Sequence, residues 1–112
     1  MNYLKVNKSK RFFHSQNEKK TVLEIGFGNA NLIQNLDSNY KKFGVERKDF
    51  IKNNKNSIKN FDEVFTSLSE LRGKYDVIFM INSLEHLSNP KQFFDILLNN
   101  LNHNGVCIIT IQ

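Results

Sequence analysis

The stretch Val22-Leu23-Glu24-Ile25-Gly26-Phe27-Gly28-Asn29-Ala30-Asn31 decides the fold of this chain. It predicts an apolar strand over about residues 21–26, then a glycine turn, then a helix over about residues 29–37. Glycine adopts backbone angles that a Cβ forbids, and it lets a ligand approach the main chain closely. Gly26 and Gly28 therefore favour a sharp turn at the carboxyl end of the strand. The first turn of the helix that follows has N–H groups without a partner inside the helix.

Glu24 is the unusual residue of this strand. A carboxylate inside a buried apolar strand is costly unless it is paired or hydrogen-bonded. Near the carboxyl end of the strand it would face a cleft and attract an ammonium or sulfonium group. This favours a nucleotide-like cofactor that carries positive charge. The alternative interpretation is an acid that pairs with a neighbouring Lys or is exposed at the strand end.

Strands and helices are expected to alternate along the rest of the chain. Asn89 and Pro90 are suited to the N-cap and first residue of a helix that continues to Leu101, and Asn104-Gly105 predicts a turn. The other expected elements are strands at 42–46, 63–66, 75–81 and 106–111 and a helix at about 48–58, anchored by Phe50, Ile51 and Ile58. Such alternation predicts an α/β fold with a parallel sheet, in which ligands bind beyond the carboxyl ends of the strands. Residues 1–20 are polar and basic and are expected to form an arm or a helix.

Composition excludes several classes of protein. The 112 residues are 39% hydrophobic and include ten Phe, which indicates one globular domain. The net charge of +5 comes mainly from Lys, and the scarcity of Arg does not favour nucleic-acid readout. No apolar run approaches the ~20 residues of a membrane span, and no apolar segment suggests a signal peptide. Cys107 is the only cysteine, so no disulfide framework or metal cluster is expected, and the expected location is the cytoplasm.

A second acid is the last residue of the next predicted strand. Glu46 ends the segment Lys42-Phe43-Gly44-Val45-Glu46, at a distance from the glycine turn that suits an acid holding a ribose. A carboxylate offers two acceptor oxygens and can take both ribose hydroxyls of an adenosyl group. The alternative interpretation is an ion pair with Arg47 or Lys48.

Five motifs together make a resemblance specific. In chain order they are Glu24-Ile25-Gly26-Phe27-Gly28, Gly44-Val45-Glu46, Tyr75-Asp76-Val77-Ile78, Leu84-Glu85-His86-Leu87 and Leu101-Asn102-His103-Asn104-Gly105-Val106. Over roughly residues 20–112 the chain resembles class I S-adenosylmethionine-dependent methyltransferases of the small-molecule type, which have a Glu-His loop after strand four. The resemblance implies a Rossmann-like three-layer αβα fold with a parallel sheet of strand order 3-2-1-4-5. It also implies a methyltransferase domain over residues 21–112 that acts on a small-molecule acceptor and releases S-adenosylhomocysteine.

The resemblance also implies roles for individual residues. Glu24, Gly26 and Gly28 would hold the methionine end of the cofactor, with Phe27 and Asn29 as backbone neighbours. Glu46 would hold the ribose hydroxyls.

The resemblance implies the remaining roles for residues in two loops of this chain. The family usually has an acid for the adenine amino group after strand three, but this chain has Thr66-Ser67-Leu68, so Ser67 or the Leu68 backbone would substitute. Asn82 and Ser83 would lie beside the sulfonium. His86 is the candidate base, because its ordinary pKa lies close to neutrality. A structural histidine that ties its loop to the next helix is the alternative.

The sequence departs from the family in two places. Ala30 replaces the third glycine of the first motif, which slightly narrows the turn. The family fold continues beyond strand five with a helix and two further strands, whereas this sequence ends at Gln112. Strand five would then present an unpaired apolar edge. Three explanations are open: the sequence is part of a longer chain, a second chain such as another copy covers the edge, or the chain is a remnant that binds cofactor without turnover.

Two other functions remain open from the sequence. A dinucleotide-binding oxidoreductase domain shares the glycine turn and the second acid, but its fingerprint requires a small residue where Asn31 stands. A non-catalytic cofactor-binding or interaction module would keep the fold without the chemistry. The methyl acceptor and the accepting atom do not follow from the sequence.

Overall fold

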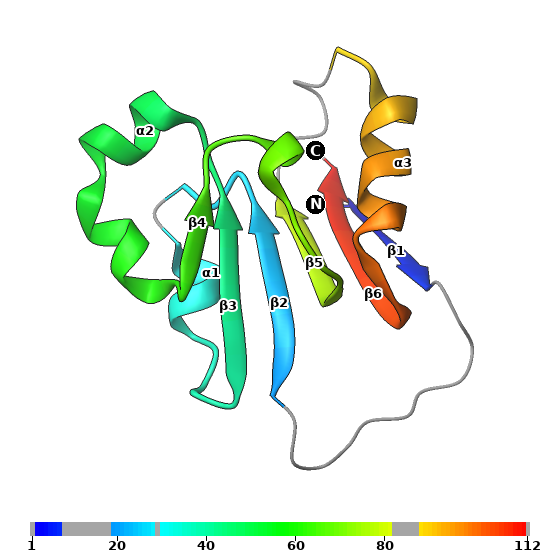
Figure 1. Cartoon of the computed structure of the whole chain (residues 1–112), viewed down its shortest axis with the longest axis horizontal. Helices are drawn as coiled ribbons and strands as arrows, with labels where there is room; N and C mark the ends of the chain where they lie inside the picture. Colours follow the sequence, from blue (N-terminus) through cyan, green and yellow to red (C-terminus); the bar gives the residue numbers. More distant parts are fainter. Residues whose placement is uncertain (1, 8–18, 29, 82–87, 112) are drawn as a thin grey trace.

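The structure is a computed structural model that describes residues 2–7, 19–28, 30–81 and 88–111. The described residues form one six-stranded sheet of order β1-β6-β5-β2-β3-β4, with helices between the strands (Figure 1). The elements are β1 (Asn2–Asn7), β2 (Lys20–Ile25), α1 (Asn31–Gln34), β3 (Tyr40–Val45), α2 (Lys48–Asn53), the 3-10 helix η1 (Lys55–Asn60), β4 (Glu63–Phe65), the 3-10 helix η2 (Leu68–Glu70), β5 (Tyr75–Ile81), α3 (Pro90–Asn99) and β6 (Leu101–Ile111).

Five strands of the sheet run parallel to one another. Across the sheet they lie in the expected order, β4-β3-β2-β5-β6. β2 pairs with both β3 and β5, β4 lies outside β3, and β6 lies outside β5. Named by their order in the parallel part, these strands give 3-2-1-4-5, which confirms the predicted α/β fold. Figure 1 shows α3 in front of the sheet and α1 behind it, so the sheet is the middle of three layers.

The main core lies between α3 and one face of the sheet. Leu23 of β2, Ile78 of β5 and Cys107 of β6 are neighbours in register, and all three are buried. Phe93 and Leu97 of α3 belong to the same buried cluster. Burial raises the pKa of the Cys107 thiol to about 11, so this cysteine behaves as a small apolar side chain.

A group of side-chain hydrogen bonds joins three strands at the end of the sheet opposite the glycine turn. The carboxylate of Asp76 accepts a hydrogen bond from the Thr21 backbone N–H at 2.8 Å, and the Thr21 hydroxyl accepts one from the Asp76 N–H at 3.1 Å. The Asn102 amide donates to the other Asp76 oxygen at 2.8 Å. These bonds hold the amino ends of β2 and β5 to the start of β6.

The N-terminal segment corrects one expectation. Residues 2–7 form neither an arm nor a helix but the strand β1, which pairs antiparallel with β6 from Asn2↔Ile111 to Asn7↔Val106. The predicted unpaired edge of strand five is therefore wrong, because the same chain covers it, and no second chain is needed there. The pairing joins segments from opposite ends of the sequence, so no local pattern could show it. Residues 8–18 lie outside the described residues.

The predicted turn at Asn104-Gly105 is also wrong. β6 begins at Leu101, and its register against β5 shifts between Tyr75↔Leu101 and Val77↔Val106. Residues 102–105 thus lie opposite Asp76 as a bulge within the strand. A Cβ at Gly105 would lie 2.7 Å from the Leu101 side chain, so the glycine marks a close approach.

Two helices are shorter than expected. α1 covers only Asn31–Gln34, and it starts later than expected because Ala30 before it has a left-handed backbone conformation. The helix expected at about 48–58 breaks at Asn54 into α2 and η1, and the Asn54 amide donates to the Phe50 carbonyl at 2.9 Å. Helical spacing does not continue across this break, and Ile58, an expected anchor, is 36% exposed. Asn89 caps α3 as predicted, since its side chain accepts from the Gln92 N–H.

Gly44 in β3 makes room for two aromatic rings. The rings of Phe27 and Phe61 pack with centroids 4.5 Å apart. A Cβ on Gly44 would lie 2.7 Å from atoms of both rings. Gly44, the first residue of the Gly44-Val45-Glu46 motif, is therefore needed for packing beneath the glycine turn.

Gly44→Ala should destabilise the fold by about 2–3 kcal/mol, because the added methyl overpacks the two rings. Urea unfolding measures this change. Gly73→Ala is the control, since Gly73 has open space but a φ of 93°, and only a backbone cost of about 1 kcal/mol is expected. If Gly44→Ala costs no more than Gly73→Ala, the packing account of Gly44 is wrong.

Candidate functional site

The turn between β2 and α1 has three left-handed residues among those described. Gly26, Gly28 and Ala30 have φ values of 68°, 56° and 61°. For the two glycines this conformation costs little, whereas for Ala30 it costs about 1–2 kcal/mol. The turn is held by hydrogen bonds from the Gly26 N–H to the Val45 carbonyl and from the Ala30 N–H to the Phe27 carbonyl, both 2.8 Å. Phe27 places its ring in the interior, where it is 3% exposed, so only its backbone belongs to the turn.

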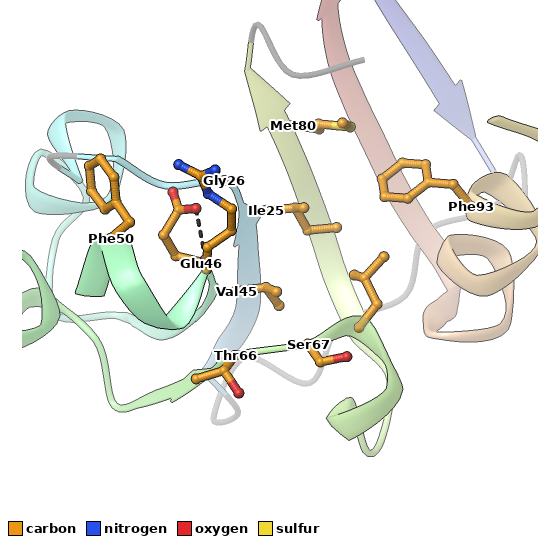
Figure 2. Close-up of a pocket in the computed structure, with 11 residues that line it drawn as sticks. Ile25, Gly26, Val45, Glu46, Phe50, Thr66, Ser67, Met80 and Phe93 are labelled. Atoms are coloured by element: carbon orange, nitrogen blue, oxygen red, sulfur yellow. Dashed lines mark hydrogen bonds between the residues drawn. The ribbon is translucent and has the colours of Figure 1, made fainter. Parts of the chain in front are cut away.

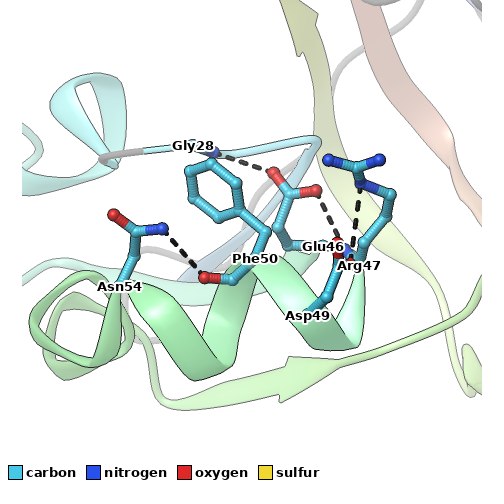
Figure 3. Close-up of polar contacts among 6 residues, drawn as sticks. All are labelled: Gly28, Glu46, Arg47, Asp49, Phe50 and Asn54. Atoms are coloured by element: carbon cyan, nitrogen blue, oxygen red, sulfur yellow. Dashed lines mark hydrogen bonds and ion pairs between the residues drawn. The ribbon is translucent and has the colours of Figure 1, made fainter.

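Glu46 lies at the carboxyl end of β3 and contacts the turn directly. Its Oε2 accepts a hydrogen bond from the Gly28 N–H at 3.0 Å, and its Oε1 accepts one from the Arg47 N–H at 2.9 Å (Figure 3). The Arg47 guanidinium faces Asp49 instead, at 3.9 Å between exposed side chains. A carboxylate has about four acceptor positions, so both oxygens of Glu46 can still accept from a ligand.

Glu24 is a buried acid with an incomplete set of partners. It is 4% exposed, and no hydrogen-bond donor among the described residues reaches its Oε1. Burial raises the pKa of the Glu24 carboxyl from 4.5 to about 7, and the charge of Glu46 adds to this shift. A backbone hydrogen bond at Ile33 acts in the opposite direction. The chemistry of the unpaired oxygen suits a cation or a hydrogen-bond donor.

Two cavities flank the turn, and Gly26 lines both. The smaller, of about 460 Å³, is lined by Glu24, Gly26, Phe27, Asn31, Leu32 and Ile81. The larger, of about 710 Å³, is lined by Ile25, Gly26, Val45, Glu46, Arg47, Phe50, Thr66, Ser67, Leu68, Met80 and Phe93 (Figure 2). Both volumes are in the range of small-molecule sites. One acid thus lies in each cavity, on either side of a single glycine.

Several lining residues were missed in the sequence analysis. Arg47 follows Glu46 directly, Phe50 lies near the start of α2, and Thr66 precedes Ser67, so the rule that ligands bind at the carboxyl ends of strands would have included them. Met80 and Phe93 line the cavity from β5 and α3. Their apolar character looked like that of ordinary core residues, and no sequence signal distinguished them.

The loop after β4 lies beside the larger cavity. The Ser67 hydroxyl caps η2 by accepting from the Ser69 N–H at 3.2 Å. The Thr66 hydroxyl donates to Glu70 at 2.6 Å. Positions 66–68 hold no acid, but Glu70 lies slightly later in the chain and contacts Thr66. Glu70 does not line the cavity.

Four predicted site residues, Asn29, Asn82, Ser83 and His86, lie outside the described residues. Among the residues that are described, no group of three or more His, Cys, Asp or Glu could hold a metal ion. None of the helices described is long and apolar enough to cross a membrane.

A family model described as a methyltransferase domain matches residues 2–112. The chain belongs to this methyltransferase domain family. No curated protein matches the sequence. The fold is similar to that of an S-adenosylmethionine-dependent methyltransferase from Clostridium acetobutylicum ATCC 824, with a TM-score of 0.67 and 20% identity over 80% of this chain and 42% of that one.

Two further solved methyltransferases share the fold. The plantazolicin methyltransferase BpumL, solved with a triazolic desmethylPZN analog and SAH, has a TM-score of 0.67 and 19% identity over 80% of this chain and 38% of its own. Coclaurine N-methyltransferase, bound to N-methylheliamine and SAH, has a TM-score of 0.66 and 16% identity over 83% of this chain and 31% of its own. This chain spans less than half the length of each of these proteins.

Glu24→Gln should stabilise the methyltransferase domain above neutral pH. With a folded pKa of about 7 against an ordinary 4.5, the folded chain binds more protons than the unfolded chain between these values, so stability falls as pH rises through that interval. At about pH 8 the neutral amide should therefore raise the free energy of unfolding by about 1–3 kcal/mol, and at about pH 4.5 the difference should be small. Urea unfolding at both pH values measures it. Glu63→Gln, which changes an exposed acid, is the control. If Glu24→Gln and the unmodified chain are equally stable at about pH 8, the charged form of Glu24 does not destabilise the fold and the prediction is wrong.

Proposed function

We propose that this chain is the cofactor-binding part of an S-adenosylmethionine-dependent methyltransferase that acts on a small-molecule acceptor. The observation that supports this most is the pair of acids on either side of the glycine turn. Glu24 offers an unpaired buried oxygen to a cation, and Glu46 offers acceptor positions beside the Gly28 N–H. A cofactor with an ammonium group at one end and ribose hydroxyls at the other matches this arrangement.

The cofactor would lie across the turn. Glu24 would hold the methionine ammonium in the smaller cavity, which Gly26 and Phe27 also line. Glu46 would hold the ribose in the larger cavity, and the base would lie toward Ser67 and Leu68. A sulfonium supplies an activated methyl group, so the protein's part is chiefly to align it with the acceptor.

The remaining roles are proposals drawn from the resemblance. Asn29 would contribute backbone near the methionine end, Asn82 and Ser83 would lie beside the sulfonium, and His86 would act as base where the acceptor needs one. Coclaurine N-methyltransferase, which shares the fold, is bound to N-methylheliamine and SAH in its structure, and this supports a small-molecule acceptor. We also propose a cytoplasmic location, supported by the single cysteine and its burial.

The two alternative functions gain no support from these observations. A dinucleotide-binding oxidoreductase has no evident use for a buried acid at Glu24, and the family model matches a methyltransferase domain instead. A non-catalytic module that associates through strand five would need that edge to be free, but β1 occupies it.

Calorimetric titration with SAH tests the proposed function. The folded chain should bind SAH saturably, and NAD should not compete for the site. The absence of binding by the folded chain at about millimolar SAH would rule the proposal out.

Glu46→Ala should weaken SAH binding by about 10- to 100-fold, because it removes charged hydrogen bonds worth about 1.5–3 kcal/mol. The matched control is Glu63→Ala, which removes an exposed acid from the start of β4 and should leave the affinity unchanged. Circular dichroism verifies that both variants are folded. Equal affinities of the two variants would exclude Glu46 from the ribose site.

A further inference from the structure

The two acids of the site differ in how their oxygens are satisfied. Both oxygens of Glu46 accept backbone N–H groups, from Gly28 and Arg47, an environment that suits a charged carboxylate. Glu24 is more deeply buried, and its Oε1 has no donor. Burial and, to a smaller extent, the charge of Glu46 both favour the protonated form of the Glu24 carboxyl, because they raise its pKa.

The described residues that pack around Glu24 bring no cation to it. In register with Glu24 are Gly44 of β3 and Phe79 of β5, and α1 consists of four uncharged residues. Lys42, earlier on β3, donates its ammonium to the Leu36 carbonyl at 2.7 Å. The guanidinium of Arg47 faces Asp49.

The cavity of about 460 Å³ gives a ligand access to this acid. Glu24 lines the cavity together with Gly26 and Phe27 of the glycine turn and with Asn31, Leu32 and Ile81. A ligand ammonium that enters this cavity would meet an acceptor without competition from a protein cation. The charge of Glu46, on the other side of Gly26, opposes a second negative charge until such a cation arrives.

We propose that the ligand-free site carries a proton on the Glu24 carboxyl, and that a ligand ammonium group displaces this proton when it binds. The Glu24 O–H bond breaks, the proton passes to bulk solvent, and the carboxylate forms an ion pair with the ammonium. No electrons are transferred, and charge balances because one cation replaces another. This inference rests on the proposed function for the identity of the ligand.

The exchange makes affinity depend on pH. Burial and Glu46 place the pKa of the Glu24 carboxyl at about 7 in the ligand-free chain. A ligand that needs the carboxylate must first displace the proton below this value, so its affinity should fall as pH decreases. Between pH 7.5 and pH 6 the expected loss is roughly five- to tenfold. A ligand without an ammonium group should show no such loss.

Calorimetry of the full chain with SAH at pH 6, in two buffers of different ionisation enthalpy, measures the proton released per ligand bound. The expected release is close to one proton for the unmodified chain and for Glu63→Gln, and close to zero for Glu24→Gln. 5′-Methylthioadenosine, which keeps the nucleoside but lacks the amino acid, should release none from any of them. Should Glu24→Gln fail to fold, the contrast between SAH and 5′-methylthioadenosine on the unmodified chain decides the question.

The outcomes separate this inference from the proposed function. SAH binding with proton release that is lost in Glu24→Gln supports both. SAH binding without proton release at pH 6 overturns the proton exchange and leaves the cofactor site standing. Proton release that persists in Glu24→Gln places the titrating group elsewhere and also overturns the inference. No SAH binding by the folded chain overturns both.

Discussion

The central position of β2 in the sheet is the constraint on which the rest of the structure depends. β3 and β5 flank this strand in parallel, so both of its edges are hydrogen-bonded, and its residues from Val22 to Ile25 are buried. Its polar backbone is satisfied by neighbouring strands, but a polar side chain on it has few partners within reach. Glu24 is buried for this reason, and the chain leaves β2 through a turn that glycine makes possible. Both acids of the site are positioned by this one strand and its neighbour.

Much of the fold could be predicted because its signals are local. The apolar run of β5, the Asn89-Pro90 start of α3 and the alternation of strands and helices all depend on residues close in sequence. β1 and the bulge at residues 102–105 could not be predicted in this way, because each depends on pairing with a distant strand. The predicted helix lengths were wrong for a third reason. Single residues, Ala30 and Asn54, adopt backbone angles that composition does not reveal.

The position of a site residue could be predicted where an acid or a glycine stands at the carboxyl end of a parallel strand. Glu24, Gly26, Gly28 and Glu46 come together at adjacent strand ends, as a parallel sheet requires. Their roles with a cofactor stay predictions until binding is measured. The apolar walls of the larger cavity were hidden, because Met80 and Phe93 are indistinguishable in sequence from core residues. The bond between Glu46 and the Gly28 N–H was also hidden, because an acid that suits a ribose suits a backbone donor equally well.

The pairing of β1 with β6 has a consequence for the order in which the chain folds. Figure 1 shows the two ends of the chain at the same edge of the sheet, and Asn2 is in register with Ile111. Contacts between such distant segments close the largest loop in the chain and form late, because their entropic cost must be met before they stabilise anything. During synthesis, β1 is made before β6, so the two strands can pair only after β6 has been made. We therefore expect the parallel strands to assemble around β2 before β1 joins the outer edge of the sheet.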